Sequence, residues 1–255
     1  MANRNETPTE VTRVAPSWLV KEAEKDKSLT GVDAHKRVPM IKCVQAMSAD
    51  EIKGYGEGAI VTAPGNQLLA APGEVLQFVP LFMFEEYCKW SDLDDKDSPM
   101  ILERSFWANS DIAIKAKDTT RRFEDYGNSY KYRYVHHLHF PGIIYTGEFK
   151  GLIATLTFCR GEFFTGQNFC SACSMRKIDG VRVPLWAQVW DLSSSQRQGR
   201  YKWQGLDLKV PELSPIIDDC DREAFKKLHV EFKELWEKSL IQVEVDSNEN
   251  INDEL

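Results

Sequence analysis

Two short segments of the chain alternate aromatic with basic residues. The first is Tyr130-Lys131-Tyr132-Arg133-Tyr134 and the second is Arg200-Tyr201-Lys202-Trp203. Flat rings stack on nucleobases for about 1–3 kcal/mol each, while cations neutralise phosphates. The pattern therefore indicates a surface for single-stranded nucleic acid.

Trp186 and Trp190 lie between these segments, four residues apart, so they share one face of a strand. Aromatic residues at period two more often form the buried face of a sheet, and for both tryptophans we favour a core position over base stacking. For the Tyr130–Tyr134 segment the two interpretations stay open. The residues that we predict to contact DNA are Arg121, Arg122, Lys131, Tyr132, Arg133, Tyr134, Trp190, Arg197, Arg200, Tyr201, Lys202 and Trp203.

The cysteines offer a weaker candidate for metal chemistry. Cys170 and Cys173 form a CxxC pair, with Cys159 upstream and His137 in a nearby predicted strand. Zinc takes four nitrogen or sulfur ligands in a tetrahedron, and these four residues would supply them. Strong zinc motifs pair a CxxC with a second CxxC or HxxxH, which is missing here. A small-residue helix face packed on a sheet explains the same residues, so we expect no metal and no cofactor.

The sequence contains no motif that indicates an enzyme. It has neither the GxxxxGK[ST] phosphate loop nor the GxSxG nucleophile motif. The acids Asp218, Asp219, Asp221 and Glu223 precede a predicted helix, where carboxylates stabilise the helix dipole. We therefore predict a binding protein without catalytic activity.

Strands and two helices are predicted to position these residues. Tyr130–Phe140 alternates as a strand, Ile143–Tyr145 and Leu152–Cys159 continue the β pattern, and Pro141-Gly142 reads as a turn. Helices are predicted at Phe163–Lys177 and at Arg222–Leu240, and the second has an apolar stripe of Phe225, Leu228, Phe232, Leu235 and Trp236. Val183–Leu192 and Arg200–Val210 should form a hairpin around the polar loop Ser193–Gly199.

Charge divides the chain into three parts. Residues 1–37 read as a flexible N-terminal arm, 38–242 as the folded body, and 243–255 as an acidic disordered tail. The net charge is −7, yet between Ala113 and Val210 fifteen Lys and Arg face eight Asp and Glu. A basic middle with acidic ends suits a protein that attracts a polyanion.

Hydropathy and the N-terminus predict a cytoplasmic protein. No stretch approaches the roughly 18 apolar residues of a membrane span, so no membrane partner is expected. The polar N-terminus lacks the apolar core of a secretory signal. The cysteines are then expected to be reduced.

The layout resembles phage single-stranded DNA-binding proteins. The resemblance rests on Val183-Pro184-Leu185-Trp186-Ala187, the polar loop, and Gly199-Arg200-Tyr201-Lys202-Trp203, followed by a late helix and an acidic tail. It implies a mainly β (β+α) fold: an oligonucleotide-binding (OB)-like five-stranded barrel with an inserted helix and a C-terminal amphipathic helix. It also implies sequence-independent coating of single-stranded DNA in phage replication and recombination, with replication proteins recruited by the tail. Such tails often end in an aromatic residue, whereas this one ends in Leu255, which puts recruitment in doubt.

Two other functions stay open on the sequence alone. A non-enzymatic virion or assembly protein would use the aromatic strands as core and would assemble without nucleic acid. A zinc-dependent nucleic-acid-binding protein would require stoichiometric metal. A homo-oligomer is compatible with each of these functions.

Overall fold

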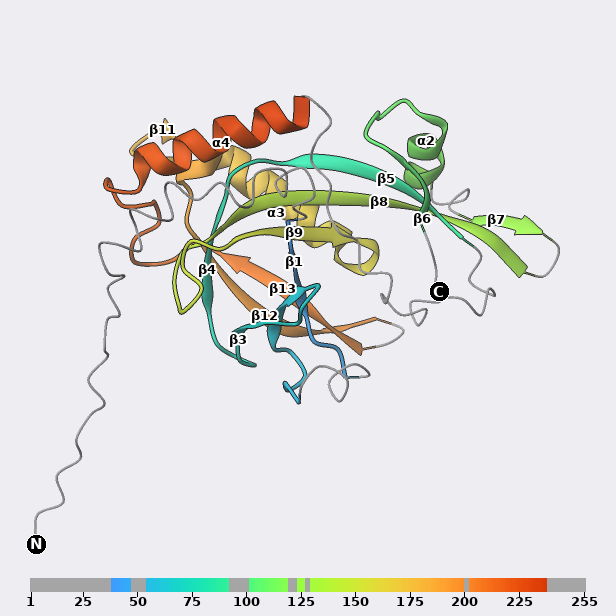
Figure 1. The fold of residues 1–255 in the computed structure, drawn as a ribbon, viewed down its shortest axis with the longest axis horizontal. Helices are drawn as coiled ribbons and strands as arrows, with labels where there is room; N and C mark the ends of the chain where they lie inside the picture. Colours follow the sequence, from blue (N-terminus) through green and yellow to red (C-terminus); the bar gives the residue numbers. More distant parts are fainter. Residues whose placement is uncertain are drawn as a thin grey trace, which may run out of the picture. The chain divides into compact units, whose positions relative to one another are not determined.

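A long, strongly curved sheet forms the body of the protein (Figure 1). The computed structural model describes residues 38–46, 54–91, 101–118, 123–126, 129–199 and 202–237, which belong to one compact unit, Arg37–Leu255. The predicted arm at 1–37 and the predicted tail at 243–255 lie outside the described residues.

Eleven strands make up the sheet, in the order β13-β12-β4-β8-β9-β1-β2-β3, with β5 and β7 also paired to β8 and β6 paired to β5. The strands are β1 (Met40–Cys43), β2 (Ile60–Ala63), β3 (Leu68–Ala70), β4 (Leu76–Pro80), β5 (Phe84–Trp90), β6 (Ile101–Ser105), β7 (Phe123–Tyr126), β8 (Ser129–Ile144), β9 (Ile153–Cys159), β12 (Trp190–Gln198) and β13 (Lys202–Lys209). β1 runs parallel to β9, and the other pairs are antiparallel.

Three α-helices and several short elements complete the described part of the chain. The helices are α2 (Asp111–Lys117), α3 (Phe163–Met175) and α4 (Arg222–Glu237). Two 3-10 turns, η2 (Arg160–Glu162) and η3 (Leu185–Ala187), and a small hairpin of β10 (Lys177–Ile178) and β11 (Val181–Arg182) connect them. The two predicted helices are confirmed as α3 and α4, and the mainly β class is confirmed with them.

The predicted barrel is not confirmed. Among the described residues no backbone ladder joins β13 to β1, so the sheet does not close. Its curvature nevertheless brings β13 beside the chain that follows β1. There Gln45 donates from Nε2 to Gln204 O at 2.9 Å, and Gln204 N donates to Gln45 Oε1 at 2.8 Å. Side-chain hydrogen bonds thus join β13 to the segment after β1 without a backbone ladder, and Gln204 Nε2 also donates to Glu57 Oε1 at 2.8 Å.

β8 is one strand of 16 residues, so the predicted turn at Pro141-Gly142 is wrong. Along its length β8 exchanges one neighbour for another: residues up to His139 pair with β5, and Gly142 to Ile144 pair with β4. At this exchange the Pro141 carbonyl accepts a hydrogen bond from Leu81 N at 2.8 Å, just after the end of β4. A Cβ at Gly142 would lie 2.4 Å from Val79 O, so only glycine permits this close approach of the strands.

The predicted hairpin exists, but its strands are displaced along the sequence. β12 begins at Trp190 and runs to Gln198, through the segment predicted as a polar loop. Trp186 lies in η3, so it does not share a strand with Trp190. The ladder reaches Gln198 opposite Lys202, which explains how polar residues can occupy a strand: β13 pairs with them residue by residue.

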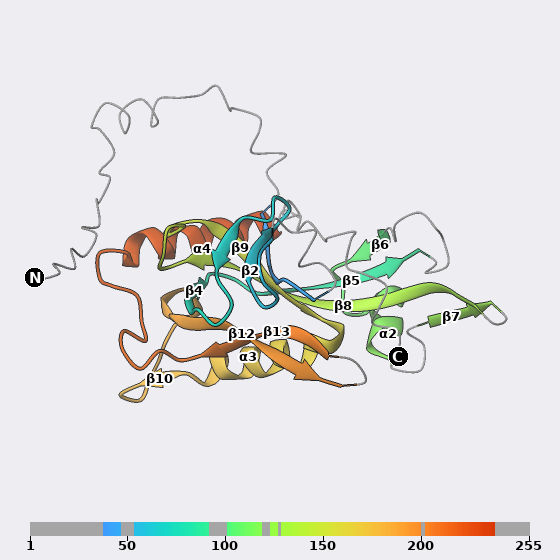
Figure 2. The same ribbon diagram turned by 90° about the horizontal axis from the view of Figure 1, so that it is seen from below.

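α3 and α4 lie on opposite sides of the sheet (Figure 2), and the two largest hydrophobic clusters include residues of these helices. On one face Phe140 and Phe158 pack against Phe169 of α3. On the other, Val79 and Ile143 belong to a cluster that includes residues of α4. Along α4 the predicted stripe is confirmed at Phe225 and Phe232, which are buried, and at the partly buried Leu228 and Trp236, whereas Leu235 is exposed.

Candidate nucleic-acid groove

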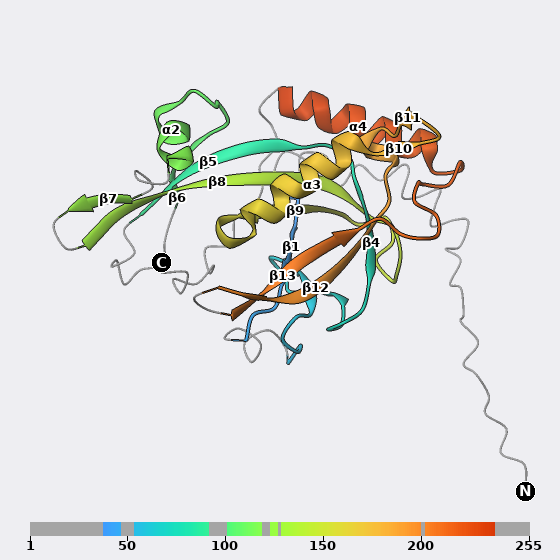
Figure 3. The same ribbon diagram turned by 180° about the vertical axis from the view of Figure 1, so that it is seen from behind.

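α3 lies beside β13 (Figure 3), and two adjoining cavities form a groove between them, which we name the α3–β13 groove. The first has a volume of about 360 Å³ and lies between Thr165 and Asn168 of α3 and Asp207 of β13. The second, of about 630 Å³, continues past Met175 and Lys209. Ala172, Trp190 and Leu208 line both, so the cavities are continuous.

The local sequence explains why a helix lies so close to this strand. β9 ends at Cys159, and η2 turns the chain directly into α3. At Gly166 a Cβ would lie 2.6 Å from Phe158 Cβ, so the glycine lets α3 press onto β9. Asp207 and Leu208 of β13 line the same cavity as Thr165 and Asn168 of α3.

Trp190 forms the floor of the groove and is 3% exposed. Phe169 packs edge-on against its ring at 4.9 Å, and the Arg176 guanidinium lies 4.8 Å from the ring centre. The indole Nε1 donates to Gln188 Oε1 at 3.3 Å. The ring faces are therefore covered by protein. The core position that we favoured for Trp190 is confirmed, and its place among the predicted DNA contacts is corrected.

Arg197 and Trp203 meet at one end of the groove, held by acids. They are opposite each other in the β12–β13 ladder. Trp203 Nε1 donates to Glu162 Oε1 at 2.8 Å, Arg197 Nε lies 3.6 Å from the same oxygen, and Arg197 Nη2 donates to Asp207 Oδ1 at 2.8 Å. Two predicted DNA contacts are thus occupied by carboxylates, and Glu162 is a partner that the sequence pattern did not reveal.

Ionisation of this cluster follows from its contacts. Partial burial raises the pKa of Asp207, but hydrogen bonds from Ser195 and Arg197 outweigh it and lower the pKa below its usual value. Partial burial acts against the charge of Arg197, yet Asp207 and Glu162 raise its pKa. The cluster is an ion pair at neutral pH that fixes the hairpin geometry.

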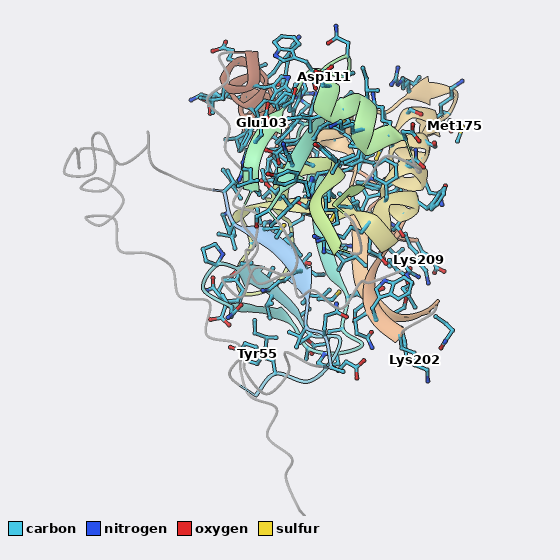
Figure 4. All side chains as sticks on the ribbon, turned by 90° about the vertical axis from the view of Figure 1, so that its right-hand side faces the viewer. Tyr55, Glu103, Asp111, Met175, Lys202 and Lys209 are labelled. Carbon is cyan, nitrogen blue, oxygen red and sulfur yellow. The ribbon has the colours of Figure 1, made fainter. Side chains whose placement is uncertain are left out.

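Lysines form the exposed margin of the groove. Lys177 and Lys209 line the larger cavity, and Lys202 lies at the start of β13; all three are exposed. Figure 4 labels Met175, Lys209 and Lys202 along one side of the molecule. Of the predicted cations whose side chains are described, Lys202 alone is exposed.

An exposed apolar strip on α3 flanks the same groove. Phe164 is 75% exposed and Met175 is 69% exposed. At 100° per residue, Phe164, Asn168 and Met175 fall on one side of the helix, and the last two line the groove. Sequence analysis missed Phe164, Lys177 and Lys209. Phe164 could have been found, because it is an apolar residue of α3 that lies outside the buried face of the helix.

The tyrosine segment does not reach the groove. Tyr134 is 2% exposed and packs in a cluster with α2, while its hydroxyl accepts from Lys115 Nζ at 3.0 Å. Arg133 is buried, and Tyr132 is half-buried with Lys89 Nζ 4.2 Å from its ring centre. Tyr134 and Arg133 are therefore core residues rather than surface contacts. The remaining predicted contacts, Arg121, Arg122, Arg200, Tyr201 and the side chain of Lys131, lie outside the described residues.

The four weak zinc candidates cannot meet. Cys170 and Cys173 of α3 pack into the core that contains Phe158. Cys159 follows Phe158 on β9 and faces the opposite side, in a cluster with Cys88. His137 also lies on that side, opposite Cys159 in the ladder. Burial raises the pKa of Cys173 to about 12, as expected for a thiol in a core.

Comparison with known proteins gives one match. No curated protein and no solved structure is significantly similar to the chain. Among the described residues, no helix has the length and apolar character needed to span a membrane. A family model described as Pam3 phage gp34-like protein matches residues 9–236, which is most of the 255-residue chain. The chain therefore belongs to the Pam3 phage gp34-like protein family, a family named for a phage protein.

Proposed function

We propose that this phage-family protein binds single-stranded DNA along the α3–β13 groove, without sequence preference and without chemistry. The observation that carries the proposal is the groove itself: an apolar floor with exposed lysines along its margin. Proteins that hold single strands combine a cationic groove that follows the backbone with rings that stack on bases.

The size of the groove favours a single strand over a duplex. The two cavities, of about 360 Å³ and about 630 Å³, are of the size that takes small flat molecules. The eight residues of β13 extend over roughly 25 Å at about 3.3 Å each, so Lys202, which lies outside the cavities, is about that far along the strand from Lys209, which lines the larger one. A duplex is instead usually read by a protein element, such as a helix, that projects into the major groove of the DNA.

Within this proposal the side chains have separate roles. Lys177, Lys202 and Lys209 neutralise phosphates, and Phe164 offers an exposed ring to a base. Arg197 and Trp203 shape one end through Glu162 rather than contacting DNA. Action in replication or recombination, in the host cytoplasm, and recruitment of replication proteins by the acidic residues 244–255 are further parts of the proposal.

Fluorescence anisotropy with a labelled oligo-dT, beside a duplex of equal length, tests this. Lys202→Ala/Lys209→Ala should weaken oligo-dT binding at low salt by tenfold or more. The matched control is Lys226→Ala/Lys227→Ala, which removes two exposed lysines from α4 on the other face. Phe164→Ala should cost about 1–3 kcal/mol if a base stacks there. Trp107→Ala removes another exposed aromatic side chain, 74% exposed, and should leave affinity unchanged.

Two outcomes contradict the proposal. One is the lack of oligo-dT binding at low salt, where phosphate contacts are strongest. The other is equal weakening by the groove and α4 variants, which would indicate non-specific attraction. Either would favour the alternative of a virion or assembly protein, for which self-association without nucleic acid is the expected behaviour.

A further inference from the structure

Three potential metal ligands meet on the face of the sheet that α4 shares. Glu86 and Cys88 are two residues apart on β5, so they point to the same side, and His137 of β8 is directly opposite Glu86. One donor atom from each lies within 4.8 Å of the other two. Exposed fractions are 1% for Glu86, 0% for Cys88 and 1% for His137. The cluster is thus sealed from solvent and separate from the α3–β13 groove.

His137 is the unexplained member of this cluster. Neither of its ring nitrogens has a hydrogen-bond partner among the described residues. A buried polar group without a partner costs about 1–3 kcal/mol, so a folded protein rarely leaves one without a reason. A cation held between His137, Cys88 and Glu86 would satisfy the imidazole lone pair.

The neighbours of Glu86 resemble the supporting residues of known metal sites. Arg104 Nη1 donates to Glu86 Oε1 at 2.9 Å, and His139 Nε2 lies 3.1 Å from Glu86 Oε2. The Thr157 hydroxyl lies 2.9 Å from His139 Nδ1 and fixes that ring. Carboxylates that bind metals are themselves oriented by such hydrogen bonds, and each oxygen keeps a second lone pair for an ion.

We propose that Glu86, Cys88 and His137 bind a divalent transition-metal ion, with zinc as the ion that this donor set favours. A thiolate with an imidazole selects zinc or a similar borderline metal over magnesium or calcium. Cys159 lies opposite His137 on β9, but it is not among the donors that lie within 4.8 Å of one another, so the proposed ligands are these three residues. This ligand set excludes Cys170 and Cys173.

Protonation states agree with such a site. Burial lowers the pKa of His137 to about 3, so the ring is neutral and presents a lone pair. The pKa of Glu86 falls to about 2 despite its burial, because His139 and Arg104 stabilise the carboxylate. Burial raises the pKa of Cys88, so an ion must displace the thiol proton to solvent as the sulfur–metal bond forms.

Access to the site requires the sheet to open or to form around the ion. β6 pairs only with β5, is exposed along most of its length, and carries Arg104. The test is therefore made on full-length protein refolded with cobalt(II), which takes zinc sites and absorbs in the near ultraviolet when bound to a thiolate. We expect one cobalt per chain with that absorption band. Cys88→Ser should lose the band, whereas the matched control Cys170→Ser should keep it.

Stability gives a second, independent readout. A ligand that binds only the folded state raises the Tm, so protein refolded with zinc should melt above protein refolded with a chelator. His137→Phe keeps an aromatic ring of similar size and should abolish this rise. The proposal is overturned if wild-type protein takes up no cobalt and shows no Tm rise. It is also overturned if the cobalt–thiolate band survives in folded Cys88→Ser. If Cys88→Ser does not fold, the proposal is overturned when the zinc-dependent rise in Tm survives in His137→Phe.

Discussion

For single residues in this protein, the contacts of a side chain decide its role more than the residue type does. Arg197 looks like a phosphate contact in the sequence, but two carboxylates engage it in the fold. The same holds for Trp203, whose indole donates to Glu162. Lys202, by contrast, is exposed, as the sequence predicted.

The ion pair between Arg197 and Asp207 should make stability depend on pH. The folded-state pKa of Asp207 is lowered, so its contribution is present above the unfolded-state pKa of about 3.9 and is lost as pH falls through the folded value. Asp207→Asn should therefore cost about 0.5–1 kcal/mol at pH 7 and much less below pH 4. Urea unfolding at several pH values measures this, with Asp219→Asn as an exposed-carboxylate control. A cost that stayed constant with pH would argue against the ion pair.

Elements are positioned by glycines at close contacts. α3 lies near β13 because Gly166 lets the helix approach Phe158, and β8 meets β4 because Gly142 leaves room for Val79 O. The Gly166 contact fixes how closely α3, which lines one wall of the α3–β13 groove, packs on β9. The shape of the groove therefore depends on where α3 packs, and not only on the residues that line it.

Gly166→Ala tests whether the close packing of α3 on Phe158 positions the helix. Two opposing effects are expected. Alanine improves helix propensity by about 1 kcal/mol, whereas a methyl group 2.6 Å from Phe158 Cβ overpacks the interface by about 1–3 kcal/mol. We expect net destabilisation and weaker oligo-dT binding as α3 is displaced. Ser171→Ala, on the exposed side of α3, should change stability by less than about 0.5 kcal/mol. An increase in stability for Gly166→Ala would mean that the helix can shift freely.

At the scale of the whole molecule, positive and negative charges are unevenly distributed. The chain carries −7 overall, yet the described groove margin presents Lys177, Lys202 and Lys209. Under the proposed function, acidic segments elsewhere would repel a polyanion and confine its contact to this margin. The salt dependence of binding reports on that arrangement.

For a single strand, log K falls with log salt by about 0.7 for each phosphate contact. Lys202→Ala/Lys209→Ala should therefore reduce the slope for oligo-dT by about 1.4, while the α4 lysine variant leaves it unchanged. Anisotropy titrations from low to moderate salt measure both slopes. Equal slopes for wild type and groove variant would show that these lysines do not contact phosphates.

The sequence by itself determined what local periodicity can encode. The mainly β class, α3 and the buried stripe of α4 followed from spacing, because period two and period 3.6 are properties of neighbouring residues. The same periodicity predicted the strand at Tyr130–Phe140, but it did not predict that this strand continues through Pro141.

Tertiary structure decided which face of each strand is covered and which side chains meet. Tyr134 is a core residue because α2 covers it, whereas the sequence left the tyrosine segment open between core and surface. The open sheet, the α3–β13 groove and the meeting of Glu86, Cys88 and His137 depend on pairings between distant strands. Loop closure and packing over many residues select those pairings, so spacing along the chain could not reveal them.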